Sequence, residues 1–588
     1  MQFIIPFILL IVPVSFESVV PLPRPCRCLY GDPCWPSQLE FDVLAARVSQ
    51  PLIQPLPPAH ACYPHIDPSG NCTDVQANWQ DGNWRADHAG AMQSPNFETF
   101  IFPNDTISAC YLNTSLEYPC TQGSVPVIGV DARSSEDVQA AVEFAASHHL
   151  RHDYLGRSAA RGAFLIWTHH LKNITFTDSF IPDGGPAFEV YENALTVGAG
   201  VQWHEAYDAA HSRNVTLGGG LSAGGSVGAA GGWMQGGGHS ALSPAYGLGV
   251  DNVLQLTVVI ANGTHLTANA YQNTDIFWAL RGGGGGTYGI VTSATYRTRP
   301  SVPMIAAFFA TIINSTDPGP SPVLERLYTE FIRISPSLSD AGWGGYASLA
   351  LGAEGTSLAL RFFFISPTTS PTQANDSLAP YFEFAQTLAA NSSVENGGAL
   401  TIVANFTTQV ESFYAWESTI FRGEGQGQVG FNAELGSRLL PRDVIEKNYK
   451  RVAQILLALP AASFYFVGGG VVSLRDPSST GLNPAWRKAM VHVLFGTGWP
   501  EGANASQIRE AEEIVKGGIA QLRAISPNSG AYFNEASMFE PNPQETFFGS
   551  HYAKLKGIKA KYDPSDLFLV AKGVGSEDWD EYLICPRK

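Results

Sequence analysis

Short apolar runs alternate with amphipathic segments between residues 126 and 300. The apolar runs are rich in β-branched residues and predict strands at 126–130, 163–168, 194–200, 253–260 and 288–298. Apolar positions at helical spacing predict helices at 134–149, 204–213 and 274–281. Ser134 or Ser135 can cap the first of these helices, and Thr274 can cap the third. Strands and helices mixed in this order predict an α+β region.

Beyond Pro300 the apolar strands and the helices become longer. Alternation predicts strands at 306–313, 358–366 and 464–474, and helical spacing predicts helices at 324–335, 442–459 and 506–525. An aromatic, turn-rich stretch runs from Tyr532 to Cys585. A chain of 588 residues is too long for a single domain with one core. We therefore expect five segments: a leader at 1–20, a Cys- and Pro-rich irregular segment at 21–123, a first α+β unit at 124–302, a sheet covered by helices at 303–505, and a C-terminal segment at 506–588.

Glycine is concentrated between Gly218 and Gly249, and no Asp, Glu, Lys or Arg lies between Asn214 and Val250. The run is not a disordered spacer, because apolar residues such as Trp233 and Leu242 are spread through it. Glycine reaches positive φ and exposes its N–H groups, and successive N–H groups can form an anion nest. The run therefore predicts a buried phosphate-bearing cofactor. The alternative is a glycine-rich region that forms turns only.

Three further motifs are weaker. Gly284-x-Gly286-x-x-Gly289 matches the dinucleotide fingerprint, but a helix-like segment precedes it and a strand-like one follows, the reverse of what that site needs. Ser222 and Ser226 lie in overlapping Gly-x-Ser-x-Gly sequences, which makes a serine hydrolase an outside alternative. The histidines around the glycine run, His239 among them, do not have the spacing of a metal site, so no metal is expected.

Composition and the N-terminus point to the secretory pathway. The apolar run from Phe3 to Phe16 is too short to span a bilayer and is typical of a signal peptide. The even cysteine count fits an oxidised framework, although the pairing stays open. A net charge of −17 argues against nucleic-acid and acidic-membrane partners. N-glycans are expected at several sequons, whose asparagines are 71, 104, 113, 173, 214, 262, 314, 375, 391, 405 and 504.

Several long motifs occur in the order found in one known family. The stretches at 152–174, 195–210, 218–263 and 275–296, with an N-terminal cysteine segment at 26–37 and the tail at 532–568, closely resemble secreted fungal berberine-bridge-enzyme-like oxidoreductases of the vanillyl-alcohol-oxidase superfamily. The resemblance covers most of the chain. It implies a PCMH-type FAD-binding domain of two α+β subdomains at 124–302, a substrate domain at 303–505, and a C-terminal berberine-bridge-like segment that completes the flavin site.

The resemblance also implies the residues of the site. His152 matches the histidine that carries the flavin covalently, and Gly224, Gly225 or Ser226 stands where many relatives have a second, cysteinyl link, so a single histidyl link is expected. Contact with FAD is implied for these three residues and for Gly236, Gly237, Gly238, Ser240, Tyr246, Gly247 and Val250. Tyr532 or Glu535 is implied as the catalytic base, with Asn534 orienting the substrate. The alternative for the last three is packing of a terminal strand.

One departure from the family pattern affects cofactor binding. Relatives have a strand and a glycine turn before the histidine, whereas Arg151 here directly precedes His152. Lost N–H donors would leave phosphate oxygens unpaired at a cost of ~1–3 kcal/mol each, so weaker FAD loading is expected.

The resemblance implies an FAD-dependent oxidoreductase that moves a hydride from an alcohol, sugar or secondary-metabolite substrate to the flavin, with dioxygen as acceptor. The alternative is a flavin-free, inactive secreted glycoprotein with the same scaffold.

Overall fold

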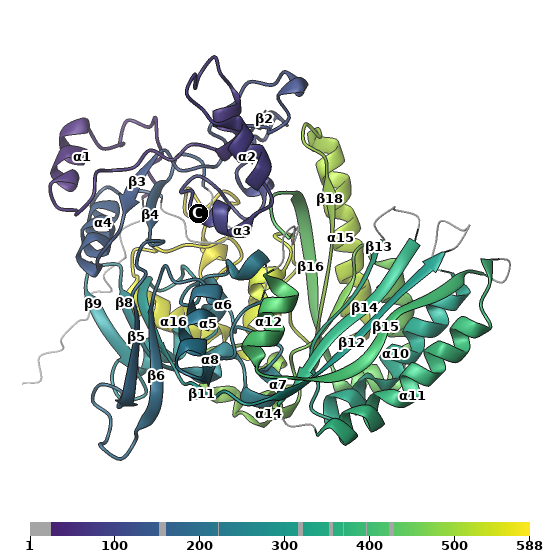
Figure 1. Ribbon diagram of the computed structural model, residues 1–588. Helices are drawn as coiled ribbons and strands as arrows, with labels where there is room; N and C mark the ends of the chain where they lie inside the picture. Colours follow the sequence, from purple (N-terminus) through teal and green to yellow (C-terminus); the bar gives the residue numbers. More distant parts are fainter. Residues whose placement is uncertain are drawn as a thin grey trace, which may run out of the picture.

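Figure 1 shows the computed structural model of the chain as two lobes with an N-terminal segment across their top. The structure describes residues 25–587 except 152–159, 222, 315–320, 352–356, 368–369, 395–396 and 423–427. Helices and sheets are both abundant, and the fold is α+β, as the sequence predicts. Among the described residues, no helix combines the length and apolar character needed to cross a membrane.

The first lobe contains a five-stranded antiparallel sheet in the order β5 (Ile174–Phe180), β6 (Tyr191–Gly198), β10 (Ile290–Tyr296), β8 (Val253–Val259) and β9 (His265–Asn269). Beside it, β3 (Ile128–Asp131) and β4 (Phe164–Trp167) form a parallel pair. The helices of this lobe are α4 (Ser135–Ser147), α5 (Trp203–Ser212), α6 (Gly232–Gln235), α7 (Ser243–Tyr246), α8 (Gly249–Asn252), α9 (Thr274–Leu280) and α16 (Tyr552–Tyr562). A two-stranded pair joins β7 (Val215–Thr216) to β11 (Arg299–Pro300).

The second lobe contains a seven-stranded antiparallel sheet in the order β15 (Ala399–Val410), β12 (Met304–Asn314), β14 (Ser357–Ser366), β13 (Gly344–Leu351), β17 (Ser463–Phe466), β18 (Ala489–Trp499) and β16 (Asn432–Pro441). Its helices are α10 (Pro322–Asp340), α11 (Pro371–Ala390), α12 (Phe413–Phe421), α13 (Arg442–Ala458), α14 (Gly470–Leu474) and α15 (Ala505–Ile525). Apolar side chains of α10, α11, α13 and α15 share one buried core with this sheet.

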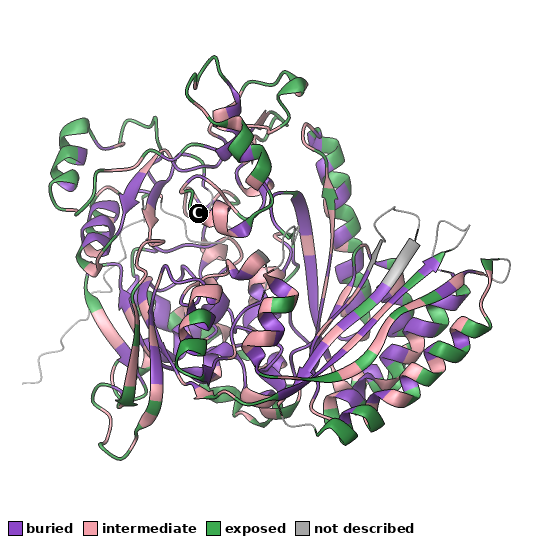
Figure 2. Cartoon of the chain, viewed as in Figure 1, coloured by how far each residue is buried: buried purple, intermediate pink, exposed green. Residues whose placement is uncertain are grey.

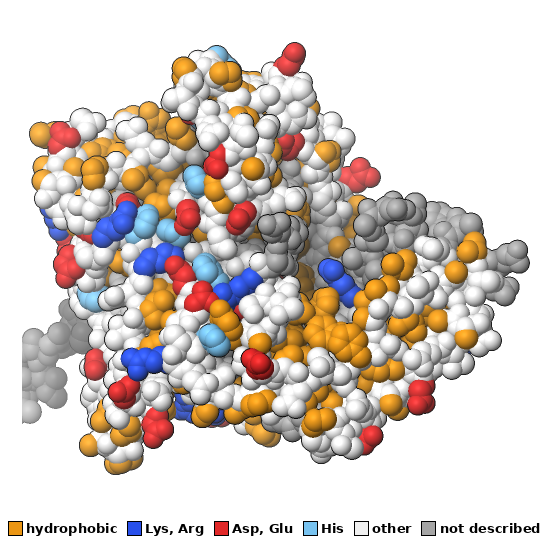
Figure 3. Space-filling model, viewed as in Figure 1, with side chains coloured by type: hydrophobic (Ala, Val, Ile, Leu, Met, Phe, Trp, Pro, Cys, Tyr) orange, Lys and Arg blue, Asp and Glu red, His pale blue; other side chains and the backbone are white. Residues whose placement is uncertain are grey.

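Figure 2 shows buried residues on the sheet side of α10 and α11 and exposed residues on the outer side, which is the burial expected of amphipathic helices. In Figure 3, hydrophobic atoms gather beside α12, over strands of the same sheet. From three neighbouring strands, half-buried Phe308 contacts half-buried Phe363 and exposed Phe406.

The N-terminal segment contains α1 (Gln38–Ala45), α2 (Cys72–Asn78), α3 (Gly82–Ala86) and the pair β1 (Phe100–Ile101) and β2 (Ile107–Ser108). The expected oxidised framework is present, since all eight cysteines are paired: Cys26–Cys585, Cys28–Cys34, Cys62–Cys72 and Cys110–Cys120. The first bridge ties the described N-terminus to the C-terminal end. The segment is less irregular than expected, because Ser37 and Glu40 form a capping box that starts α1.

Most predicted elements are confirmed, including Ser134 as the cap of α4, where its side chain accepts from the Asp137 N–H. Three predictions need correction. Asn273, in the left-handed region at φ 50°, holds the N-cap position of α9 in place of Thr274. The strand predicted at 464–474 ends at Phe466, because Gly469 and Gly470 adopt φ of 72° and 46° and α14 begins there. The turn-rich tail contains the helix α16.

Candidate functional site

A cavity of about 380 Å³ lies where the glycine run, the N-terminal segment, β16 and the C-terminal segment meet. Its lining is mostly apolar or glycine, with a few polar and charged groups: Arg85, Gln93, Ser94, Ser226, His239, Glu434, Asn534 and Glu535. Enclosed apolar cavities with a few converging polar groups are typical of sites for small molecules and cofactors.

One wall of the cavity is the glycine run. Gly220, Gly228, Gly231 and Gly232 line it together with Trp233, whose indole N–H donates to the His239 carbonyl at 3.1 Å. A Cβ added at Gly228 would meet nothing within 4 Å, so that backbone faces open space. The absence of side chains leaves room for a flat group against this wall.

The facing wall includes residues 82–97 of the N-terminal segment, among them Arg85, Met92 and Phe97. Arg85 is buried, donates to the Met92 carbonyl at 2.6 Å and forms an ion pair with Glu98. Burial raises the pKa of Glu98 to about 7, although the Arg85 guanidinium opposes the shift. The pair holds the loop that closes this side of the cavity.

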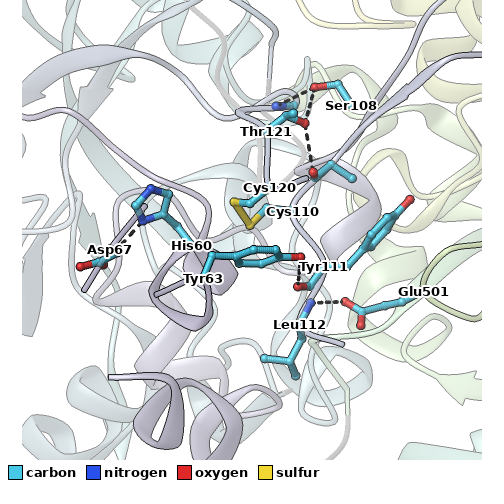
Figure 4. Close-up of a disulfide and its surroundings, with 12 residues drawn as sticks. His60, Tyr63, Asp67, Ser108, Cys110, Tyr111, Leu112, Cys120, Thr121 and Glu501 are labelled. Atoms are coloured by element: carbon cyan, nitrogen blue, oxygen red, sulfur yellow. Dashed lines mark hydrogen bonds and ion pairs between the residues drawn. A yellow bond between two sulfur atoms is a disulfide. The ribbon is translucent and has the colours of Figure 1, made fainter. Parts of the chain in front are cut away.

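The Cys110–Cys120 disulfide closes a loop of the same segment, and this loop contacts the second lobe. In Figure 4, the Leu112 N–H donates to Glu501 at 2.8 Å, and the Tyr63 hydroxyl donates to the Tyr111 carbonyl at 3.0 Å. The Asn113 N–H donates to the other oxygen of Glu501 at 2.9 Å. The position of the N-terminal wall therefore depends on contacts made outside the cavity.

The third part of the lining is the start of the C-terminal segment, where Tyr532, Asn534 and Glu535 meet the glycine run. Asn534 Nδ2 donates to the Gly232 carbonyl at 2.6 Å and to the Tyr532 hydroxyl at 2.8 Å. The Tyr532 hydroxyl donates to the Trp233 carbonyl at 3.2 Å. These bonds fix the segment against the glycine wall.

Glu535 lies between two histidines. His239 Nε2 is 3.2 Å from its Oε1, and His492 Nε2 is 2.8 Å from its Oε2. Burial would raise the pKa of the Glu535 carboxyl, but His239 and His492 outweigh it and hold that pKa well below its usual range. Burial lowers the pKa of His492, against the pull of Glu535. The carboxylate is therefore held as an anion at the cavity.

The structure brings the three predicted catalytic residues and Ser226 to this cavity. Gly224 and Gly225 come just before Ser226 and have φ of 68° and 78°. Gly236 packs under Asn534, since an added Cβ would lie 2.5 Å from that amide. Five more predicted cofactor residues form buried or half-buried turns outside its lining: Gly237, Gly238, Ser240, Tyr246 and Gly247. Val250 is fully buried, and His152 lies outside the described residues.

Sequence reasoning did not single out two residues of the site. His492 occupies an inward position on β18 among apolar neighbours, where nothing in the local pattern marks it. His239 lies within the glycine run, directly after Gly236–Gly238, and that position was its only signal. The N-terminal wall had no signal at all, because its residues reach the cavity only through the tertiary fold.

The two competing motifs have the contexts expected for chance matches. The Gly284–Gly289 motif follows α9 and precedes β10, which confirms that it lacks the strand-then-helix context of a dinucleotide site. Residues 223–225 form a short 3-10 turn. No hydrogen bond from Ser226 to a histidine occurs among the described residues, and Ser222 lies outside them.

Comparison with known proteins defines the class. An FAD binding domain family matches residues 126–269, and a berberine and berberine-like family matches residues 531–575. An uncharacterized FAD-linked oxidoreductase of Arthroderma benhamiae is 36% identical over 582 residues, covering 95% of each chain. The FAD-linked oxidoreductase patO of Aspergillus clavatus is 33% identical, covering 94% of this chain and 92% of its own.

Solved structures agree with these relatives. The VAO-type flavoprotein MtVAO713 from Myceliophthora thermophila C1 has a TM-score of 0.83 at 26% identity, covering 96% of this chain and all of its own. The chain belongs to the berberine-bridge-enzyme-like FAD-linked oxidoreductases of the vanillyl-alcohol-oxidase superfamily. It is an FAD-dependent oxidoreductase, as the resemblance implied.

The cavity fits a flavin on two observations. The glycine wall is free of side chains at Gly228. The buried Nδ1 atom of His239, which lines the cavity, has no hydrogen-bond partner among the described residues. A ring system with its own donors and acceptors could meet such an atom. The glycine run and the 532–535 segment would hold the cofactor, and FAD would supply a hydride acceptor.

Proposed function

We propose that this chain is a secreted oxidase that removes a hydride from an alcohol, sugar or secondary-metabolite substrate, with dioxygen as the final acceptor. The observation that carries the proposal is the Glu535 carboxylate, an anion that lines a largely apolar cavity opposite the glycine wall. Such a group can accept a hydrogen bond from a substrate hydroxyl or amine and orient its C–H bond. The apolar lining excludes water from the reacting carbon.

Glu535 is the better supported of the two candidate bases. Its side chain is 28% exposed, whereas Tyr532 is 1% exposed and its hydroxyl is engaged with Asn534 and Trp233. The side-chain amide of Asn534 donates to Gly232 and Tyr532, which favours a role in holding the 532–535 segment against the glycine wall. The predicted cofactor contacts along the glycine run remain part of the proposal, as does a covalent link through His152.

Secretion belongs to the same proposal. The four disulfides suit an oxidising compartment. All sequon asparagines are exposed except Asn405, which is half-buried, so their positions are compatible with N-glycans.

Spectroscopy and peptide mapping test the proposal on the secreted full chain. We expect a yellow protein whose absorbance stays with the polypeptide after acid precipitation, and a flavin peptide that contains residue 152. His152→Ala should release the flavin. With a substrate found by hydrogen peroxide release from a panel of alcohols and sugars, Glu535→Gln should lower kcat by about 10²–10⁴-fold. A protein that stays colourless with added FAD, even after the missing strand and turn are restored, would contradict the proposal.

A further inference from the structure

The arrangement of Glu535 between His239 and His492 goes beyond a single catalytic base. We propose that these three side chains take up the substrate proton as one unit, in which Glu535 and His239 face the cavity and His492 is a positioning residue behind them. The inference deepens the proposed function and rests on it for the substrate. It assigns roles to two histidines that lie far from Glu535 in the sequence.

The contacts fix the direction of hydrogen bonding. A carboxylate only accepts, so each histidine donates its Nε2–H to Glu535, at 3.2 Å from His239 and 2.8 Å from His492. The Nδ1 atoms of both rings are buried and have no partner among the described residues. The resting unit is therefore a carboxylate that accepts a hydrogen bond at each of its oxygens.

Access separates the roles of the two histidines. His239 and Glu535 line the cavity, whereas His492 does not and is fully buried on β18. A substrate in the cavity can contact the first two only. His492 can act solely through Glu535, by holding one oxygen of the carboxylate in place.

The hydrogen bonds couple the three side chains as one proton acceptor. Because Glu535 shares a hydrogen bond with each histidine, an added proton is held by the imidazoles and the carboxylate together, and its midpoint belongs to the group. In the reaction the O–H or N–H bond of the substrate breaks and its proton joins the unit, whose charge rises by one. The electron pair of the neighbouring C–H bond leaves with the hydride, as in the proposed function.

The side chains around these three groups either stay neutral or have contacts of their own. The rings of Tyr346, Tyr465 and Tyr532 lie around His239, with centroids 5.2–6.3 Å away. Burial raises the pKa of Tyr346 and Tyr465, so both stay neutral in the working range. Two charged groups on the cavity wall have contacts of their own: Arg85 pairs with Glu98, and Glu434 accepts from Ser537.

A metal ion is the main alternative for this cluster. The three donor atoms lie within 4.8 Å of one another, close enough to share an ion. Histidines that bind metals almost always donate their other N–H to a partner. Neither Nδ1 has one among the described residues. The geometry therefore favours a hydrogen-bonded unit that carries protons.

Ring NMR of the full chain with ¹⁵N-labelled histidine tests the proposal without substrate and without loaded flavin. His239 and His492 are assigned by substitution. We expect Glu535→Gln to lower the midpoint of His239, because it removes a neighbouring negative charge. His492→Phe should raise the same midpoint, because the carboxylate then loses a neutral donor and holds the His239 proton more tightly.

Two controls separate this role from general packing. His492→Gln can still donate from Nε2 and should keep the wild-type midpoint of His239. His265→Gln removes a histidine that contacts Thr292 at 2.9 Å, elsewhere in the first lobe, and should change nothing at His239. Once a substrate is known, the acid limb of kcat/KM should move in the same directions as the NMR midpoint.

Two results would overturn the proposal. One is a His239 midpoint that does not move in Glu535→Gln. The other is one equivalent of zinc or iron that purifies with the wild type and is lost in His492→Phe. A colourless protein that shows the expected midpoints would defeat the proposed function and leave the coupling of the three side chains standing, so the two failures are distinguishable.

Discussion

The two walls of the cavity are built in different ways. The glycine wall comes from one continuous stretch, which its composition alone sets apart from the rest of the chain. The facing wall combines residues 82–97, residues 433–435 and residues 532–538, which lie far apart in the sequence. The first wall is a local property of the sequence, whereas the second is a property of the fold.

The walls also differ in what stabilises them. The glycine wall relies on close packing, since Gly219 and Gly220 lie directly on the rings of Trp203 and Trp233. The N-terminal part of the facing wall relies on polar contacts, chiefly the buried pair of Arg85 and Glu98. Close packing tolerates no added volume, and a buried ion pair does not tolerate loss of one partner. Substitutions in the two walls should therefore fail for different reasons.

The largest effect is expected from Arg85→Met in the facing wall. It removes the guanidinium that neutralises buried Glu98, and breaking such a pair costs about 3–5 kcal/mol. We expect a lower melting temperature and faster hydrogen exchange in residues 82–97 than in the glycine run. The double variant Arg85→Met/Glu98→Gln should recover most of the loss. Equal destabilisation in the single and double variants would show that the charge of Glu98 is not the cause.

Glu98→Gln should change how stability depends on pH. The folded protein holds the proton of Glu98 up to about pH 7, whereas the unfolded chain releases it near 4.5. The folded state therefore binds more protons between these values, and this group makes stability fall as pH rises from about 4.5 to about 7. Melting temperatures across this range should show that contribution in the wild type and lose it in Glu98→Gln. A difference between the two proteins that is constant with pH would contradict the argument.

A glycine pair tests the other wall with a smaller effect. An added Cβ at Gly219 would lie 2.2 Å from the Trp203 ring, whereas one at Gly228 meets nothing within 4 Å. Gly219→Ala should cost about 1–3 kcal/mol through overpacking, and Gly228→Ala should leave the melting temperature unchanged. If both variants melt like the wild type, the glycine wall is not closely packed at Gly219.

The sequence could predict most of the fold because its elements have strong local signals. The cap at Ser134 and the alternation in β12 and β14 are local features, and the structure confirms them. The errors fall at Asn273 and Gly469, where a positive φ sets the start of a helix or the end of a strand. That angle cannot be read from residue type alone. The pairing of Cys26 with Cys585 required the fold, because the two ends approach only in three dimensions.

The candidate site was predictable in part, for the same reason. Tyr532, Asn534 and Glu535 came from a resemblance of the C-terminal segment, and all three line the cavity. His492 could not be found, since an inward histidine on a strand is indistinguishable from a core residue in one sequence. Arg85 could not be found either, because its role depends on a disulfide-bridged segment that reaches across both lobes.

The smallest effect is expected where the N-terminal part of the facing wall contacts the glycine run. Asn83 Nδ2 donates to the Gly224 carbonyl at 3.3 Å, and its Oδ1 accepts from Gln202 Nε2 at 3.2 Å. Both bonds are long, so Asn83→Ala should cost at most about 1 kcal/mol. The matched control is Asn78→Ala, because Asn78 donates only within its own helix, to Asp74.

Hydrogen exchange can resolve this small effect where melting cannot. Asn83→Ala should speed exchange both in residues 82–86 and around Gly224, whereas Asn78→Ala should affect α2 alone. In a double-mutant cycle, Asn83→Ala and Gln202→Ala should be less than additive, because the two side chains share one bond, although Gln202 also contacts Ser226 and Lys172. Fully additive effects would mean that the bond between Asn83 and Gln202 does not couple the N-terminal segment to the glycine wall.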